Sequence, residues 1–442
     1  MKLKLTFLIL IISILSAKAQ KEEKQEIVKQ GWNFGALPAI AFDSDLGFQY
    51  GGLINLYHYG DGSRYPEYNH SFYLEISRFT KGSGVYQFQY DSDRLLKGIQ
   101  TVADLSYLTD LTYQFYGFNG YDAVYNEDWL DEDHPDYRSR VFYNYDRKLF
   151  RFKVDLQGPL AQSNFKWEAG INFQKFKLAS VNINKLNKGK DEVDKLPDIA
   201  GLYNIYQQWG LVGSEEANGG NIPALRGGLI YDSRDFRAIP GKGIWSEAVL
   251  EYVPKILGAE SSFTRLGITH RQYFTIVSKK LIFAYRLSYE ATLSGNVPFY
   301  YLTKRVVDGA KGNSMEGLGG GRTMRGVLRN RVIGDDVAFG NFELRSRIWN
   351  FQYKNNNFFV GLNGFIDTGK VTGKHALNFY PSFAAVDTEG YLDYNSEEWH
   401  TSYGLGIKAG MNENFVVSCD YGRVTDDRDG SSGLYIKLNY LF

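Results

Sequence analysis

Apolar and polar side chains alternate with a period of two along much of this chain of 442 residues. The stretches 72–77, 86–90 and 152–157 show the pattern clearly, because an apolar or aromatic residue occupies every second position. Successive side chains of a β-strand point to opposite faces, so this period predicts strands with two different faces. No sustained period of 3.6 residues follows residue 19, which argues against a helical fold.

Alternation and turn residues together place sixteen strands, an even number, as single-chain bacterial membrane barrels require. The predicted fold class is therefore all-β, a 16-stranded antiparallel transmembrane β-barrel. The predicted strands are 32–43, 46–59, 68–80, 84–94, 98–117, 139–157, 164–182, 222–232, 243–255, 262–278, 280–294, 337–349, 358–368, 400–411, 414–424 and 432–442.

The lengths of the connections between these strands follow a parity. The long connections are 118–138, 183–221, 295–336 and 369–399. All four are odd-numbered, whereas even-numbered connections such as 278–280 and 411–414 are short and 60–67 is intermediate. Outer-membrane barrels have long loops outside and short turns in the periplasm, and a soluble β-sandwich has no reason to obey this rule. The parity therefore favours a closed barrel, which satisfies its backbone in lipid.

The first nineteen residues have the features of a secretory signal peptide. Lys2 and Lys4 form a basic start, 5–15 is apolar, and Ala17-Lys18-Ala19 is a small-x-small cleavage site. The apolar run is shorter than the roughly 20 residues of a membrane-spanning helix. We therefore divide the chain into a signal peptide at 1–19, a short periplasmic lead-in at 20–31 and a barrel at 32–442.

The last residues of the sequence form the cleanest alternating strand. One face carries Leu434, Ile436, Leu438, Tyr440 and Phe442, and the other carries Tyr435, Lys437 and Asn439. In a membrane barrel the first face meets lipid and the second meets a wet lumen. We interpret Leu438, Tyr440 and Phe442 as a terminal strand signal of an integral multi-pass β-barrel in the outer membrane of a Gram-negative cell. An exported soluble β-protein is the alternative.

Composition agrees with a barrel and restricts the partners. Mean hydropathy is only −0.34, yet Phe, Trp and Tyr make up 16% of the residues, as aromatic girdles at two membrane interfaces require. Outer-membrane lipids are therefore the expected partners. The formal net charge of zero gives no attraction to nucleic acid, and none is expected as a partner.

The residues that could carry chemistry form no recognisable site. The stretch 127–136 combines acidic residues with His134, and 185–198 is charge-rich, but neither has the spacing of a metal-binding loop. We interpret both as solvated loops. The six histidines lie outside any nucleophile motif, and the single Cys419 lies on a strand pattern. The sequence therefore predicts no enzyme, no cofactor and no metal.

A glycine-rich segment at 319–327 lies inside the connection 295–336 and lacks the Gly-Lys-Ser/Thr ending of a phosphate-binding loop. Its motif Met324-Arg325-Gly326-Val327, with Phe365-Ile366-Asp367-Thr368-Gly369 on the thirteenth strand, resembles the BamA/TamA-like superfamily of outer-membrane barrels, the bacterial surface antigen family. The resemblance extends from about residue 225 to residue 442. Further matching segments are 231–235, 240–243, 295–299 and 341–345.

The resemblance implies that the connection 295–336 is an extracellular loop that folds into the lumen, where Arg325 reaches Asp367. A guanidinium group makes two parallel hydrogen bonds to a carboxylate, which a lysine does not. The candidate loop motif and lumen lock comprises Met324, Arg325, Gly326, Val327, Phe365, Asp367 and Gly369. Met324 and Val327 depart from the family's aliphatic and aromatic residues, so the loop tip is expected to pack differently.

The resemblance also implies a function in inserting or translocating outer-membrane or surface proteins. The seam between the strands 32–43 and 433–442 would open so that a client strand adds to an exposed edge. Gly35 and Pro38 are expected to make this pairing the weakest in the barrel. Family members that insert proteins carry POTRA domains before the barrel, which are not found here, so a separate periplasmic or lipoprotein partner is expected. A passive pore or a lipid-handling barrel without a protein client is the alternative.

Overall fold

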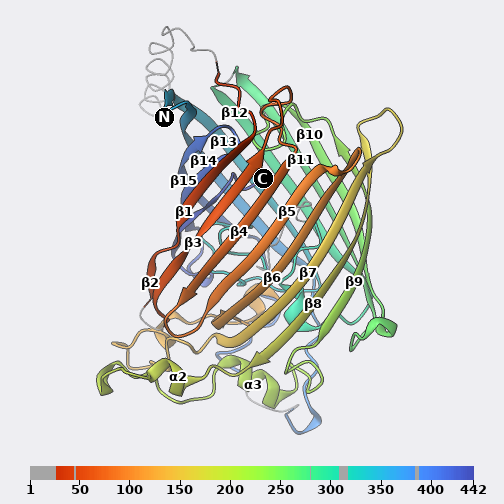
Figure 1. Ribbon diagram of the computed structural model, residues 1–442. Coiled ribbons are helices and arrows are strands. Elements are labelled where there is room, and N and C mark those ends of the chain that lie inside the picture. The colour runs from red at the N-terminus through yellow and green to blue at the C-terminus, as the bar shows by residue number, and fades with distance from the viewer. Residues whose placement is uncertain (1–25, 44–45, 279, 308–316, 384–387) are drawn as a thin grey trace, which may run out of the picture.

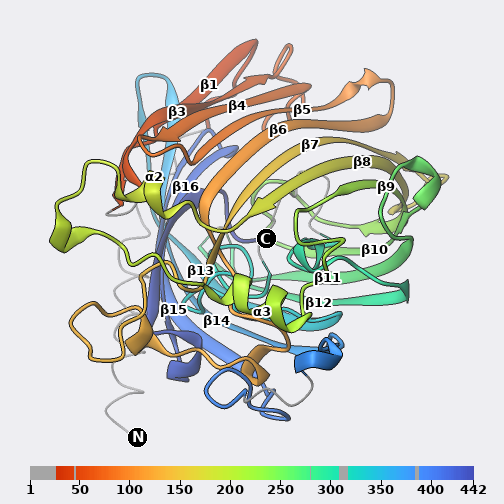
Figure 2. The same cartoon turned by 90° about the horizontal axis from the view of Figure 1, so that it is seen from below.

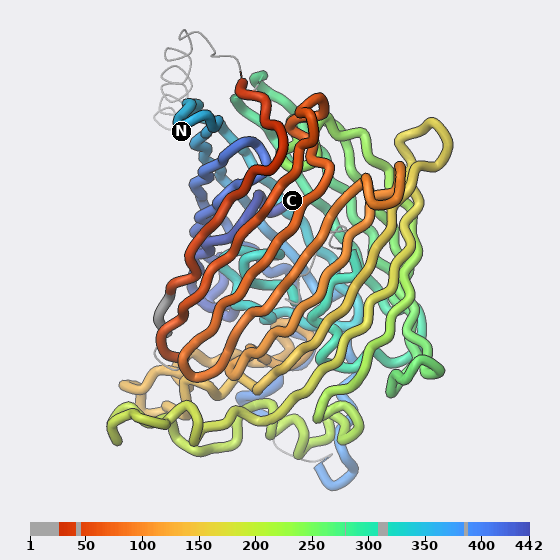
Figure 3. Tube along the Cα trace, viewed as in Figure 1, coloured from red at the N-terminus to blue at the C-terminus, as the bar shows by residue number. Residues whose placement is uncertain are grey.

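A computed structural model describes residues 26–43, 46–278, 280–307, 317–383 and 388–442. The strands lean around a barrel whose axis is upright in Figure 1, and the continuous tube in Figure 3 shows them following one another around the wall. The predicted signal peptide at 1–19 lies outside the described residues. No helix within those residues is long and apolar enough to cross a membrane.

The wall is built from long strands, and the helices are short and lie in the connections. The strands are β1 (Trp32–Pro38), β2 (Ala41–Asp43), β3 (Gly47–His58), β4 (His70–Phe79), β5 (Gly84–Leu96), β6 (Ile99–Gln114), β7 (Asn144–Pro159), β8 (Phe165–Ala179), β9 (Asn221–Asp232), β10 (Gly243–Val253), β11 (Phe263–Val277), β12 (Leu281–Gly295), β13 (Asp336–Tyr353), β14 (Asn356–Gly373), β15 (His400–Met411), β16 (Phe415–Val424) and β17 (Ser432–Leu438). The α-helices are α2 (Ile183–Asn187), α3 (Leu202–Trp209) and α4 (Phe299–Leu302). The 3-10 helices are η1 (Gly120–Asp122), η2 (Glu127–Trp129), η3 (Glu192–Asp194), η4 (Lys255–Leu257), η5 (Pro381–Phe383) and η6 (Asp427–Asp429).

The seventeen described strand segments form sixteen wall strands. β1 and β2 both pair with β3, in one continuous antiparallel register that is interrupted only at Ala39 and Ile40. Every later strand pairs antiparallel with the strand before it, from β3–β4 to β16–β17. The predicted sixteen-stranded antiparallel architecture is therefore confirmed, and the predicted strand order holds throughout.

The two ends of the barrel differ as the predicted parity requires. The long connections follow β6, β8, β12 and β14 and span 115–143, 180–220, 296–335 and 374–399. Because β1 and β2 form one wall strand, these are odd-numbered connections of the sixteen-stranded wall. They emerge at one end, which is the lower end in Figure 1. Turns such as 354–355 and 412–414 lie at the other end. The largest boundary errors are of five residues: β7 begins at Asn144 rather than at 139, and β14 ends at Gly373 rather than at 368.

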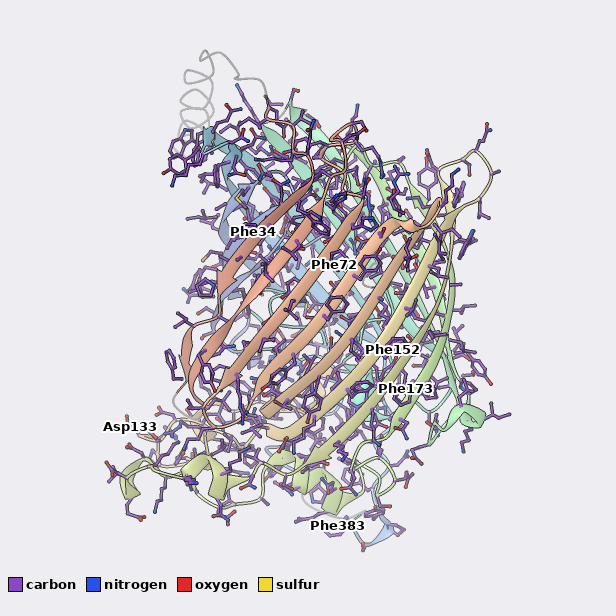
Figure 4. The ribbon with its side chains drawn as sticks, viewed as in Figure 1. Phe34, Phe72, Asp133, Phe152, Phe173 and Phe383 are labelled. Carbon is purple, nitrogen blue, oxygen red and sulfur yellow. The ribbon has the colours of Figure 1, made fainter. Side chains whose placement is uncertain are left out.

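The outer and inner faces of the wall have opposite chemistry. The outer face exposes apolar side chains, including Phe34, Leu74, Ile76, Phe152, Leu344 and Ile436. Figure 4 labels Phe34, Phe72, Phe152 and Phe173 along the strands of this wall. The inner face buries charged side chains, including Asp155, Arg226, Glu251, Arg265 and Glu290. An apolar exterior around a polar interior is the arrangement of a membrane barrel and the reverse of a soluble one.

An aromatic cap closes the end that carries the long connections. Residues from 115–143, 180–220, 296–335 and 374–399 pack into one apolar cluster in which Phe115, Tyr206 and Phe299 are almost fully buried. Arg331 donates to the carbonyl oxygens of Gly120 and Ala123, at 2.8 and 2.9 Å, and so ties two connections together. Figure 2, seen along the barrel, shows these connections lying across the opening.

We expect an arginine to be tolerated on the inner face of β7 but not on its outer face. Phe152→Arg places a cation on the outer face and should destabilise the barrel folded in lipid vesicles by about 2–4 kcal/mol, because the charge meets hydrocarbon. Lys153→Arg, the adjacent residue on the inner face, should have little effect. The measurement is a denaturant titration of the heat-modifiable folded band in gels. Equal losses in both variants would contradict the assignment of the faces.

Candidate functional site

The described residues 317–335 of the connection between β12 and β13 lie inside the barrel and carry Arg325 to the inner wall. The guanidinium group of Arg325 meets Asp367 of β14 in two parallel contacts, with Nε 2.8 Å from Oδ2 and Nη2 2.9 Å from Oδ1. The Arg325 backbone N–H also donates to Asp367, at 3.0 Å. A second carboxylate, Glu343 of β13, accepts from Nη1 at 2.6 Å. The structure therefore brings together the two residues that the sequence paired.

Two further wall residues hold this contact in place. The guanidinium carbon of Arg325 lies 3.5 Å above the centre of the Phe365 ring, which is a cation–π geometry. Asn341 of β13 donates to Asp367 at 2.8 Å and to the carbonyl oxygen of Thr323 at 2.6 Å. Arg325, Asn341 and Asp367 are fully buried, so each polar atom is satisfied inside the lumen rather than by bulk water.

Glycines allow the loop backbone to approach the wall at this point. Gly326 has a φ of +104°, a left-handed conformation that favours glycine. Gly422 of β16 faces the loop, and a Cβ there would lie 2.4 Å from the carbonyl oxygen of Arg325. Met324 and Val327 are fully buried in an apolar cluster with Phe339 and other side chains of the loop and wall. Gly369 lies against Met324, where a Cβ would approach the sulfur to 2.7 Å.

The last strands also hold the loop, through residues to which the sequence assigned no part in the lock. Tyr435 accepts a hydrogen bond from the Gly326 N–H at 3.1 Å, and Lys437 donates to the carbonyl oxygen of Gly321 at 2.5 Å. Asp420 lies 3.5 Å from Lys437 and 2.5 Å from Lys408. Alternation placed Tyr435 and Lys437 on the lumen face, which is confirmed, but it could not show what they contact.

We expect Arg325 and Asp367 to behave as one unit. Arg325→Ala or Asp367→Ala should each weaken the attachment of the loop by about 3–5 kcal/mol, because each leaves an uncompensated buried charge. The double variant should be little worse than either single one, and Arg325→Lys should restore little. The measurement is protease cleavage of the loop in isolated membranes.

Arg329→Ala is the matched control for this prediction. Arg329 is an arginine of the same loop, and it lies 3.2 Å from Asp110 in a partly exposed pair. Exposed pairs contribute only about 0–1 kcal/mol, so this variant should remain close to the wild type. Additive losses for Arg325→Ala and Asp367→Ala would show that the two residues do not depend on each other.

The predicted pairing between the first and last strands is not found. Among the described residues β1 pairs only with β3 and β17 only with β16, so no backbone ladder closes the seam. The ladder of β17 ends at Leu438, paired with Val417, rather than continuing to residue 442. Asn439 then adopts a φ of +66°, which turns the chain out of the strand.

The end of the chain enters the lumen, which corrects the prediction for Tyr440 and Phe442. Both side chains are buried, whereas Leu434 and Ile436 on the same sequence pattern are exposed. The carbonyl oxygen of Phe442 accepts from Arg345 Nη2 at 2.9 Å, and the same guanidinium lies 4.6 Å from the Phe442 ring. Figure 2, seen along the barrel, places the C-terminal label inside the ring of strands. Alternation failed here because the left-handed residue at 439 ends the period.

The two edges of the sheet overlap instead of pairing. Phe415 and Val417 lie on the face of β16 that exposes Tyr421, which is the outer face. They pack against Leu37 of β1 and Tyr57 of β3, which lie on the inner face of those strands. The inner face of the first strands therefore covers the outer face of the last ones. We call this side-chain contact of Phe415 and Val417 with Leu37 and Tyr57 the seam joint.

Gly35 makes room for this joint. A Cβ at Gly35 would lie 2.4 Å from the Phe415 ring, closer than real side-chain contacts. We expect Gly35→Ala to displace the ring and to reduce stability by about 1–3 kcal/mol, the usual cost of overpacking. Gly227→Ala on β9 is the control, because no atom lies within 4 Å of a Cβ there. The measurement is the temperature midpoint of the heat-modifiable band, and equal midpoints would contradict the close contact.

The fold and the site define a class of protein: a sixteen-stranded barrel with a polar lumen, occupied by its own loop through an arginine held by acidic wall residues. Residues 83–439 match the Omp85 superfamily domain, and the chain therefore belongs to the Omp85 superfamily. This agrees with the resemblance to BamA/TamA-like barrels found in the sequence. No curated protein matches the chain.

Two solved structures are similar to this chain in fold. BamA from Haemophilus ducreyi, in a structure lacking POTRA domains 1–3, aligns with a TM-score of 0.50 and 14% identity over 93% of this chain and 70% of that chain. CdiB from Escherichia coli aligns with a TM-score of 0.52 and 10% identity over 92% of this chain and 61% of that chain. The chain thus spans about two thirds of the length of these structures.

Proposed function

We propose that this protein lies in the outer membrane of a Gram-negative cell and assists the insertion or translocation of other outer-membrane or surface proteins. Membership of the Omp85 superfamily and the fold of the BamA and CdiB barrels support this proposal. The observation that carries it is the seam, where the backbone edges of β1 and β17 have no ladder between them in the described part of the chain. Such edges template the pairing of another strand.

The mechanism follows from the two kinds of contact at the seam. Side-chain packing between Phe415 and the inner face of β1 and β3 excludes water and lipid, but it leaves the backbone edges available. Separating packed side chains does not require a row of backbone hydrogen bonds to break at once. A client strand that enters the seam gains those bonds with β1, and the buried lock at Arg325 keeps the loop and the wall in register meanwhile.

The alternative of a passive pore is less well supported. Arg325 fixes its loop in the lumen, and the aromatic cap covers the mouth at which the long connections emerge. The end of the chain occupies further lumen space beside Arg345. A pore would have to displace several buried contacts before ions passed, whereas insertion at the wall does not require this.

We also infer that the protein acts by binding rather than by catalysis. His400 has a carboxylate at each ring nitrogen, with Nδ1 2.6 Å from Asp429 and Nε2 3.2 Å from Glu397. Tyr121 donates to the same Asp429 at 2.7 Å. These contacts join the start of β15 to Glu397 and to Asp429 of η6, which Tyr121 of η1 also holds, so this histidine has the environment of a structural residue. The molecules bound would be the client protein and a periplasmic or lipoprotein partner.

A disulfide across the seam joint tests the proposal. A Cβ at Gly35 would lie 2.4 Å from Phe415 Cγ, so the two Cβ atoms are at most about 3.9 Å apart, within the range of a disulfide. We expect the oxidised Gly35→Cys, Phe415→Cys variant, on a Cys419→Ser background, to lose insertion of a client barrel in proteoliposomes and to regain it on reduction. The two single variants are the controls. Full activity in the oxidised form would eliminate opening at the seam.

A further inference from the structure

The turn end of the seam is joined by polar contacts that are separate from the seam joint. On one side lie the described part of the lead-in, residues 26–31, and the turn 59–69 between β3 and β4. On the other side lie the turns 354–355 and 412–414, which belong to β13–β16. Segments about 330 to 360 residues apart in the sequence therefore meet here, directly across the gap that has no ladder. Figure 3 shows the start of the tube beside these blue turns.

Asn414 makes the first set of contacts across the seam. Its side-chain amide donates to the hydroxyl oxygen of Tyr59 at 3.0 Å and to the carbonyl oxygen of Pro66 at 2.5 Å. Its own carbonyl oxygen accepts from the Tyr57 hydroxyl at 2.8 Å. The side chains of Asn414, Tyr57 and Tyr59 are all buried, so these hydrogen bonds are shielded from water.

Asn357 makes the second set, with the lead-in. Its amide group pairs with the backbone of Ile27 in both directions: Nδ2 lies 2.8 Å from the carbonyl oxygen, and Oδ1 lies 3.0 Å from the N–H. Lys29, a buried lysine, donates to the carbonyl oxygen of Asn355 in the adjacent turn. The lead-in is therefore held by the backbone of Ile27 and by the side chain of Lys29.

We propose that these contacts form a periplasmic clasp that sets how often the seam opens. The clasp consists of Ile27, Lys29, Tyr57, Tyr59 and Pro66 on one side and Asn355, Asn357 and Asn414 on the other. The seam joint supplies apolar packing, and the clasp supplies the directional hydrogen bonds that a β-ladder would otherwise provide. A periplasmic partner that takes hold of the lead-in removes the Asn357 contacts and so releases the first strands from the last.

Asn412 provides a matched control for Asn414 within the same turn. Both are buried to a similar degree, with 6% and 7% of their surface exposed, and each makes hydrogen bonds through its side chain. Asn412 bonds to Asn356 at 2.8 Å and to the Asn357 N–H at 3.1 Å, both on its own side of the seam. Its φ of +52° favours glycine as the replacement, because glycine removes the side chain without strain.

The experiment measures opening directly, without a client. Val417→Cys on a Cys419→Ser background places a partly buried thiol in the seam joint, where N-ethylmaleimide should react faster when the seam opens. We expect Asn414→Ala and Asn357→Ala each to raise the labelling rate about fivefold or more, because each removes shielded hydrogen bonds across the seam. Asn412→Gly should leave the rate within about twofold of the parent.

Other outcomes would overturn the clasp. An equal increase for Asn412→Gly and Asn414→Ala would show only that the turn had been weakened. An unchanged rate in variants that keep the heat-modifiable folded band would show that the clasp does not control opening. If a wall variant fails to fold, Ile27→Pro replaces it, because proline removes the N–H bonded to Asn357 from a segment outside the wall strands.

The clasp depends on the proposed function only for its effect on client insertion. Experiments can therefore reject the clasp and the insertion function separately. Faster labelling without any change in client insertion would leave the clasp standing and count against insertion at the seam. If the clasp variants are labelled at the parent rate and the oxidised seam disulfide abolishes insertion, the insertion proposal stands and the clasp is eliminated.

Discussion

The buried arginine of the folded-in loop is the interaction on which the rest of the structure depends. Arg325 meets Asp367 and Glu343 inside a wall whose outer face is apolar, so its charge has no access to bulk water. Charges in such a place persist only when they are paired and hydrogen-bonded. The loop backbone therefore has to come within reach of β14, and Gly326 and Gly422 leave the space that this requires.

The position of the loop in turn explains how the sheet ends. The side chains of Tyr435 and Lys437 of β17 bond to the loop while their backbone pairs with β16, and the chain beyond Asn439 turns inward to Arg345. What remains between the first and last strands is an overlap of faces, with Phe415 seated over Gly35. An interface of this kind separates more readily than a ladder, and this is the physical basis of the insertion that we propose at the seam.

The sequence predicted the wall well because its signal is local. Alternation depends only on which neighbours face lipid and which face water, so it located sixteen strands and the end at which the long connections lie. It also placed Arg325 and Asp367 in one site, through motifs that resemble a known family. It did not assign Glu343, Asp420 or Tyr435 to that site, because a charged or aromatic residue on a lumen face looks the same whether it meets solvent or a loop.

The sequence by itself determined the barrel class, the strand order and the two motifs of the lock. Tertiary structure alone decided the seam. A single left-handed residue, Asn439, ends the alternation and carries Tyr440 and Phe442 from the predicted outer face into the lumen. The contacts of Ile27 with Asn357 and of Tyr57 with Asn414 join segments more than 300 residues apart. No local pattern encodes such contacts, because their geometry exists only once the sheet has curled round and its two edges have met.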